Sequence, residues 1–282
     1  MHSAHTPFWV RYLLLLLALA WVGLWILLPV STVVYGAFAN GWGSYLSALA
    51  DPESVHAFYL TLIAALWSVA INLVFGLAAA WAIAKYQFRG KTLLLSLIDL
   101  PFSVSPVIAG LVFVLLFGGQ TLAGTWLAAQ HIQILYALPA IVIATVFVTF
   151  PFVAREVLPV MEAMGTEEEE AALTLGASGW QTFWLITLPG IKWGLLYGVI
   201  LCTARAFGEF GAVAVVSGRI AMETNTLSLH VEKLYQEYQS QAAFAVASAL
   251  LVIALLTLVA KSAVEWRLRR ALTEIKHAPE SV

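Results

Sequence analysis

Long apolar stretches with few or no charged residues alternate with short polar segments along the chain. A bilayer core about 30 Å thick needs about 20 apolar residues in a helix, and each of these stretches is long enough to cross it. The pattern predicts helices over residues 12–35, 57–84, 93–117, 134–154, 193–216 and 242–260. The sequence therefore predicts an all-α polytopic membrane protein with six transmembrane helices.

Composition supports this prediction and excludes several classes of protein. Hydrophobic residues make up 61% of the 282 positions and charged residues 11%, against roughly 45–50% and about 25% in a soluble domain. The net charge of −2 gives no indication of a nucleic-acid partner. Cys202 is the only cysteine, which excludes an intrachain disulfide and a thiolate metal cluster. The first apolar stretch is longer than the core of a signal peptide, so we expect it to be retained as a helix.

The Lys and Arg residues predict the orientation, because cationic loops stay in the cytoplasm. With the N-terminus inside, eleven of the 14 Lys and Arg residues fall on cytoplasmic segments, and only Arg219 and Lys233 fall on external loops. We therefore expect both termini to be cytoplasmic. Two further segments are long enough to meet a soluble partner, the cytoplasmic residues 155–192 and the external residues 218–241.

The cytoplasmic segment carries the turn chemistry of two short helices. Thr166 and Glu169 fit a capping box, in which the hydroxyl and the carboxylate each satisfy a free backbone N–H. Gly176 stands where a left-handed C-terminal cap favours glycine. The first short helix is therefore predicted to begin after Thr166 and to end at Gly176.

A second capping pattern followed by a proline bounds the next helix, at Ser178, Gln181 and Pro189. Because proline disfavours helical geometry in the residue before it, we expect this helix to end near Thr187. Trp180, Phe183 and Trp184 share one face of the helix. Such a face is suited to a groove on another protein or to the bilayer interface, and the periodicity leaves both open.

The same segment carries a family motif at every fixed position: Glu170, Ala171, Ala172, Gly176, Ile186, Leu188 and Pro189. It resembles the EAA motif of ABC-importer permeases, which those proteins also keep on a cytoplasmic loop between membrane helices. The resemblance implies the fold of a type I ABC importer transmembrane domain. It also implies that the second short helix is a coupling helix seated in a separate ATPase subunit, with Trp180, Phe183 and Trp184 in the contact.

Two opposite charges fall inside the fifth apolar stretch. Arg205 and Glu209 are four residues apart, share a helix face and are expected to form an ion pair. The pair either neutralises itself inside the bundle or brings Arg205 to an anion path or gate. The surrounding residues 204–212 resemble the Arg-x-x-Gly-Glu-Phe-Gly stretch of importers for sulfate, thiosulfate and molybdate, and Gly208 and Gly211 would let a neighbouring helix approach closely.

The third apolar stretch contains a charge and two prolines. Prolines free backbone carbonyls, and in lipid such breaks persist only beside protein or a water-filled cavity, so we expect a kinked helix that faces a pore; a purely structural kink is the alternative. The candidate residues of a translocation path or gate are Asp99, Pro101, Ser103, Ser105, Pro106, Arg205 and Glu209.

Similarity to a family of membrane proteins extends over residues 51–267, and it is strongest to the W-type permease subunits of bacterial sulfate/thiosulfate importers, which are related to molybdate permeases. The resemblance implies a bacterial inner-membrane location. It divides the chain into an N-terminal helix with the first external loop, a permease core that includes the coupling loop, and a cytoplasmic tail: residues 1–50, 51–260 with 155–192, and 261–282.

The resemblance also implies the partners, which are a second permease of a distinct T-type, two cytoplasmic ATPase subunits and a periplasmic sulfate- or thiosulfate-binding protein. The sequence contains no Gly-x4-Gly-Lys-Ser/Thr phosphate loop, because Lys85 stands where the first glycine before Gly90 and Lys91 belongs. We therefore expect no catalytic residue, metal site or cofactor in this chain, with ATP and Mg²⁺ bound by the partner ATPase.

Two other functions remain open at this point. A molybdate or tungstate permease would share the same motifs. An ion-coupled secondary transporter would use Asp99, Arg205 and Glu209 as a proton relay, but it predicts inverted repeats and gives no reason for the EAA motif.

Overall fold

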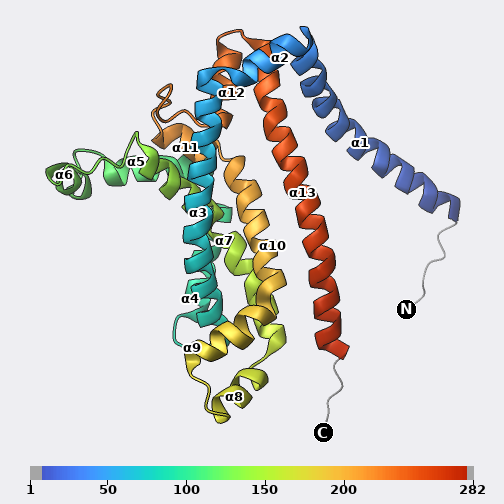
Figure 1. Ribbon diagram of the computed structural model, residues 1–282, viewed down its shortest axis with the longest axis vertical. Coiled ribbons are helices and arrows are strands. Elements are labelled where there is room, and N and C mark those ends of the chain that lie inside the picture. Colours follow the sequence, from blue (N-terminus) through green and yellow to red (C-terminus); the bar gives the residue numbers. More distant parts are fainter. Residues whose placement is uncertain (1–7, 278–282) are drawn as a thin grey trace. The chain divides into compact units, whose positions relative to one another are not determined.

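The computed structural model describes residues 8–277, and every regular element in that range is helical (Figure 1). The contacts define two compact units, Met1–Asp51 with Val231–Ala249 and Pro52–His230 with Leu250–Val282. The first unit contains α1 Phe8–Phe38 and α2 Gly41–Ala50, and the helices α12 Leu227–Gln236 and α13 Ser240–His277 contribute to both. The second unit contains α3 Pro52–Lys85, α4 Lys91–Ser103, α5 Pro106–Phe117, α6 Leu122–Ala129, α7 Leu138–Met164, α8 Glu167–Thr174, α9 Gly179–Thr182, the π-helical turn η1 Phe183–Thr187, α10 Leu188–Phe207 and α11 Gly211–Val216.

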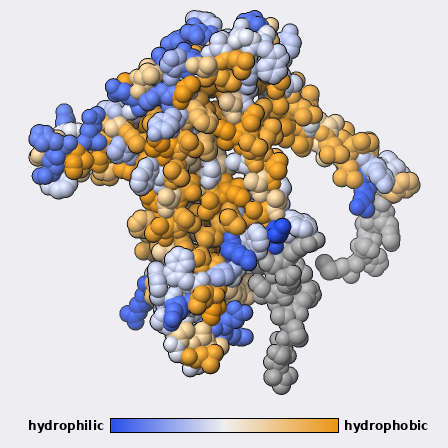
Figure 2. Space-filling view, viewed as in Figure 1, coloured by the Kyte–Doolittle hydropathy of each residue, from blue (hydrophilic) through white to orange (hydrophobic). Residues whose placement is uncertain are grey.

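Within the described residues, five helices are long and apolar enough to cross a membrane, and a bent pair of helices makes a sixth candidate span. The five are Phe8–Phe38, Pro52–Lys85, Leu138–Met164, Gly179–Phe207 and Ser240–Leu268. The prediction of an all-α polytopic membrane protein is confirmed. Figure 2 shows largely apolar surfaces on the long helices of the second unit, with hydrophilic residues gathered around α8.

The third predicted span is not one kinked helix. Its two halves, α4 and α5, meet at an angle of 108°. Val104 has an extended backbone, and Pro106 starts the new helix, in which its missing N–H is not needed. The two prolines therefore do different things, because Pro101 is buried within α4 whereas Pro106 begins α5.

The fourth and fifth predicted spans also have different ends in the structure. The helix α7 runs through Pro151 and Pro159 to Met164, so Arg155, predicted to follow the fourth span, lies within this helix. Buried neighbours on α3 and α10 pack against α7 here, and packed neighbours allow a membrane helix to tolerate proline. The fifth candidate span begins at Gly179 instead of residue 193 and ends at Phe207 instead of residue 216.

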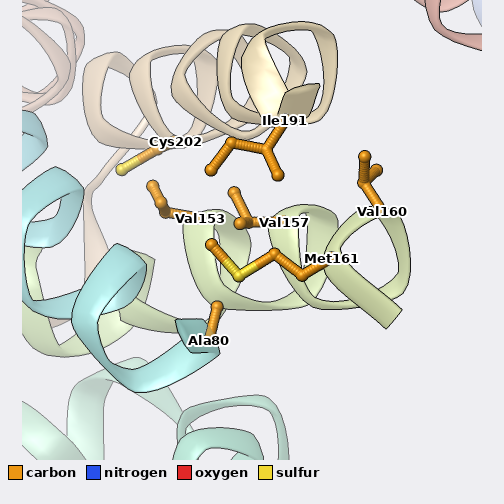
Figure 3. Packing of buried hydrophobic residues seen from close by; sticks show 7 residues of the cluster. All are labelled: Ala80, Val153, Val157, Val160, Met161, Ile191 and Cys202. Carbon is orange, nitrogen blue, oxygen red and sulfur yellow. The ribbon is translucent and has the colours of Figure 1, made fainter. Parts of the chain in front are cut away.

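The helices α3, α7 and α10 form the core of the second unit (Figure 3). Small residues bring them close together. A Cβ atom at Gly194 would lie 2.7 Å from Val160 Cγ2, and one at Gly198 would lie 3.1 Å from Val153 Cα. Membrane helices associate through close packing of this kind, because lipid offers no hydrophobic driving force between them. The cluster shown in Figure 3 consists of Ala80, Val153, Val157, Val160, Met161, Ile191 and Cys202.

In the first unit, α1 and α2 pack against the start of α13. Gln241 Nε2 donates to the carbonyl of Ala37 at 3.0 Å, and the hydroxyls of Tyr45 and Ser248 lie 3.2 Å apart. None of the most apolar 18-residue window of α1 is buried. The N-terminal helix therefore offers a continuous apolar surface of the kind that lipid covers.

Candidate functional site

The first helix of the cytoplasmic loop, α8, ends as the sequence predicts. Gly176 has φ = +88°, in the left-handed region. The N–H of Ala177 donates to the carbonyl of Ala172 at 3.0 Å, which closes the last turn. A Cβ atom at Gly176 would meet nothing within 4 Å, so the backbone conformation alone requires glycine here.

The predicted capping box at the start of α8 is wrong. Thr166 occupies the N-cap, but its side chain makes no capping hydrogen bond. The carboxylate of Glu169 instead lies 3.0 Å from Lys85 Nζ and accepts a hydrogen bond from the hydroxyl of Thr187 at 2.6 Å. The Lys85 ammonium from α3 holds this carboxylate because its full positive charge adds a Coulomb attraction that a backbone N–H lacks.

The pairing of Glu169 with Lys85 was not predicted from the sequence. Their side chains are only 13% and 8% exposed, and Lys85 Nζ also donates to the carbonyl of Gly165. The cluster joins the end of α3, the start of α8 and the π turn η1. The available signal was Lys85 at the end of an apolar stretch and a run of four glutamates at residues 167–170, and spacing along the chain does not show which glutamate Lys85 meets.

The second capping box is confirmed, whereas the predicted stop at Pro189 is wrong. Ser178 N donates to Gln181 Oε1 at 2.8 Å, and Gln181 N donates to Ser178 Oγ at 3.3 Å. The chain then continues as a single helix from Gly179 to Phe207. The π turn accommodates the proline, because the N–H of Leu188 reaches back five residues to the carbonyl of Phe183. The predicted coupling segment, residues 179–187, is therefore continuous with α10.

The aromatic face of this segment is divided between solvent and the chain itself. Trp180 and Trp184 are 70% and 50% exposed. Phe183 is half-buried, with its ring centroid 5.6 Å from that of Trp81 on α3. The three rings and neighbouring α3 side chains line an apolar groove of about 580 Å³. Of the three aromatic rings, therefore, only those of the two tryptophans are freely available to a soluble partner.

The remaining motif residues occupy both sides of the loop. Glu170 and Ala171 are exposed, while Ala172, Ile186 and Leu188 are half-buried. Three further apolar side chains of the loop are well exposed and were not selected from the sequence: Leu173, Leu175 and Leu185. They lie outside the aromatic face, and no helical spacing in the sequence predicts that they are exposed.

Asp99, predicted as a path residue, forms an ion pair with Arg155 on α7. Arg155 Nε donates to Asp99 Oδ1 at 2.6 Å, and Arg155 Nη2 donates to the other carboxylate oxygen. The contact is therefore bidentate. Ser103 and Ser105, on either side of the α4–α5 break, are both exposed.

The predicted ion pair in the fifth stretch is confirmed, but its setting differs from the prediction. Arg205 Nη1 lies 2.7 Å from Glu209 Oε2. Arg205 is in the last turn of α10, while Glu209 lies in the break before α11 and accepts a hydrogen bond from Ala212 N at 2.9 Å. The helix is interrupted because the carboxylate satisfies this N–H at the start of the next helix.

The predicted close approach at two glycines holds for one of them. A Cβ atom at Gly211 would lie 3.1 Å from Pro106 Cβ, so α11 and the start of α5 touch here. At Gly208 the nearest atom would be 3.8 Å away and belongs to the preceding turn. Gly211 is therefore a packing glycine, whereas Gly208 is not.

The structure is a bundle of helices long and apolar enough to cross a membrane, which is the architecture of a membrane-spanning subunit. The chain belongs to the family described as binding-protein-dependent transport system inner membrane component, whose model matches residues 72–271. It is therefore the membrane component of such a system and not its ATPase.

Individual relatives cover almost the whole chain. It is 54% identical to the sulfate transport system permease protein CysW of Synechocystis sp. over 92% of this chain and 94% of that one. The protein of the same name from Escherichia coli K12 is 48% identical, over 89% and 88%. The sulfate transport system permease protein CysT of Escherichia coli K12 is 40% identical, over 90% and 91%.

A solved structure has the same fold. The crystal structure of a bacterial alginate ABC transporter, in complex with an alginate pentasaccharide-bound periplasmic protein, matches with a TM-score of 0.75. The match covers 94% of this chain and 95% of that chain at 19% identity. At this identity the match establishes the fold alone, and the fold is that of an ABC importer membrane subunit.

Proposed function

We propose that this chain is the permease subunit of an ATP-driven importer that carries sulfate or thiosulfate across the bacterial inner membrane. The supporting observation is an identity of 48–54% to proteins named as sulfate transport permeases, over about nine-tenths of each chain.

The proposed assembly contains four other chains. A second permease of the T-type pairs with this one, and the 40% identity to a T-type relative supports a pair of similar folds. Two cytoplasmic ATPase subunits bind ATP and Mg²⁺, and a periplasmic binding protein delivers the anion. The exposed Glu170, Trp180 and Trp184 offer the ATPase one charged and two aromatic contacts.

The geometry of the loop supports a mechanism of coupling. Because η1 joins α9 to α10 without a break, movement of the coupling segment moves α10 as well. The ion pair between Glu169 and Lys85 links the same loop to the end of α3. Closure of the ATPase pair would thus displace two core helices together and open the path outward, and hydrolysis would reverse the movement.

The path residues predicted from the sequence keep their assignment in this proposal. Asp99, Ser103 and Ser105 line it near the α4–α5 break, where Pro101 and Pro106 shape the backbone. Arg205 and Glu209 stand at the second break, between α10 and α11. An anion moving through apolar helices needs cationic groups at such points.

Uptake of labelled sulfate into right-side-out membrane vesicles that contain ATP, with the binding protein added outside, tests the proposal. With ATP present and the proton gradient collapsed, we expect uptake to continue. Uptake that stops with the gradient would indicate secondary transport. Uptake of molybdate in preference to sulfate would assign the chain to a molybdate importer, and growth of a deletion strain on sulfate as sole sulfur source provides an independent check.

A further inference from the structure

One face of α4 is polar along its whole length. Thr92, Ser96, Asp99 and Ser103 follow one another at spacings of four, three and four residues, which places them on one side of the helix. Thr92, Ser96 and Ser103 are exposed and Asp99 is half-exposed. The stripe leads from the start of α4 to its break from α5.

The adjacent face of the same helix is also exposed but apolar. Leu93, Leu97 and Leu100 are 64%, 53% and 43% exposed. A third face, which includes the buried Ile98 and Pro101, packs into the second unit. Since α4 exposes one polar and one apolar face, the two faces meet different surroundings in the membrane.

Arg155 extends the polar stripe onto α7. Asp99 lies eight residues from the start of α4 and Arg155 nine residues from the end of α7, so both are about 12–14 Å from these helix ends. The side chains are nevertheless 33% and 53% exposed. Both residues belong to candidate membrane spans, where a charge that faces lipid is costly, so we expect this face to meet water or protein.

We propose that this stripe lines a water-filled path for the anion and that Arg155 is a residue that binds the anion there. The proposal rests on the proposed function, because it takes the ligand to be a tetrahedral oxyanion such as sulfate. A guanidinium has five N–H donors, of which Asp99 accepts one from Nε and one from Nη2. The other three can donate to an arriving oxyanion, which then replaces the carboxylate on the first two.

The second ion pair of the membrane region is built differently. Glu209 is 1% exposed and is held additionally by Ala212 N, whereas Arg205 is 32% exposed. Because the Glu209 carboxylate is enclosed and has two partners, it cannot leave its arginine easily. Asp99 and Arg155 are open to solvent and can part at little cost. The exchangeable anion contact is therefore assigned to Arg155.

Cysteine accessibility tests the path. In the complete transporter with Cys202→Ala as background, Ser96→Cys is compared with its neighbour Leu97→Cys on the apolar face, using a charged thiol reagent. Because thiolates form and react in water, we expect Ser96→Cys to react at least about tenfold faster. Equal rates, or an unreactive Ser96→Cys, would overturn the proposed path. This comparison does not depend on transport, so a failure of sulfate uptake would leave it interpretable.

Protection by the anion tests the role of Arg155. In inside-out vesicles, sulfate should slow the labelling of Ser96→Cys, whereas chloride at equal ionic strength should not. Adding Arg155→Gln should remove the protection, and Arg155→Lys should retain part of it. Protection that persists in Arg155→Gln, or no protection in the parent, would overturn the assignment of Arg155 as an anion-binding residue.

Discussion

Two ion pairs of the second unit differ in their access to solvent. The side chains of Lys85 and Glu169 are 8% and 13% exposed, whereas those of Arg155 and Asp99 are 53% and 33% exposed. Separating a buried pair leaves an uncompensated charge, while an open pair parts at small cost. The first pair is therefore suited to a permanent link between the coupling loop and α3. The second is suited to a contact in which an anion can replace the carboxylate.

The largest expected effect is at the buried pair. Lys85→Ala leaves the Glu169 carboxylate without its charge partner, and loss of one partner of a buried pair costs about 3–5 kcal/mol. We expect a lower unfolding temperature and loss of ATP-driven uptake. The double variant Lys85→Met with Glu169→Gln, which leaves no lone charge, should recover most of the stability. Thermal unfolding of the purified complex measures the stability of both variants. An unchanged midpoint in Lys85→Ala would show that the ion pair does not stabilise the loop.

A smaller effect is expected at the pair between α10 and α11. Arg205→Gln removes the charge but keeps an amide N–H that can donate to the enclosed Glu209 carboxylate beside the bond from Ala212 N, so we expect a cost of about 1–3 kcal/mol. Uptake should fall while the complex still assembles. The open pair provides the control, since Arg155→Gln should lower stability less than Arg205→Gln. The reverse order in thermal unfolding would contradict the distinction between enclosed and open pairs.

The cap of α8 should have an effect of about 1–2 kcal/mol, because Gly176→Val places a β-branched residue at φ = +88°. We expect the transporter that carries this altered loop to hydrolyse ATP without a matching uptake of the anion. Gly179→Ala is the matched control, because a Cβ atom there meets nothing within 4 Å and its backbone is helical. The ratio of anion imported to ATP hydrolysed decides the matter, and a normal ratio in Gly176→Val would count against a role of the cap in coupling.

The smallest effect on stability is expected at the exposed aromatic residues. Trp180→Asp with Trp184→Asp should release the ATPase subunit and leave the membrane helices folded, because both side chains are at least half exposed. Phe183→Asp should instead destabilise the chain, since Phe183 packs on Trp81. Co-purification with the ATPase, together with thermal unfolding, separates loss of docking from loss of stability. Retention of the ATPase by the double variant would refute a docking role of Trp180 and Trp184.

Local signals in the sequence predicted much of the fold. The positions of the apolar stretches gave the membrane helices, and the short-range patterns at Gly176 and at Ser178 with Gln181 gave the cap and the capping box that the structure contains. Each of these depends on residues within one or two turns. The similarity of the EAA motif also led to the correct family.

The features that sequence reasoning missed depend on contacts between distant residues. Glu169 leaves its predicted cap because Lys85, far away in the sequence, offers a charge. The π turn lets the helix pass Pro189, and packing between Pro106 and Gly211 accompanies the break in the third span. Spacing along the chain could not pair Asp99 with Arg155, because nothing local relates α4 to α7.

Site-specific crosslinking from the coupling segment tests the central claim most directly. Trp180→Cys, in the Cys202→Ala background and the intact membrane, would carry a short thiol-reactive photo-crosslinker. The account predicts a covalent product with the ATPase subunit, whose yield changes when ATP is added. Products formed with lipid alone, with and without ATP, would contradict it.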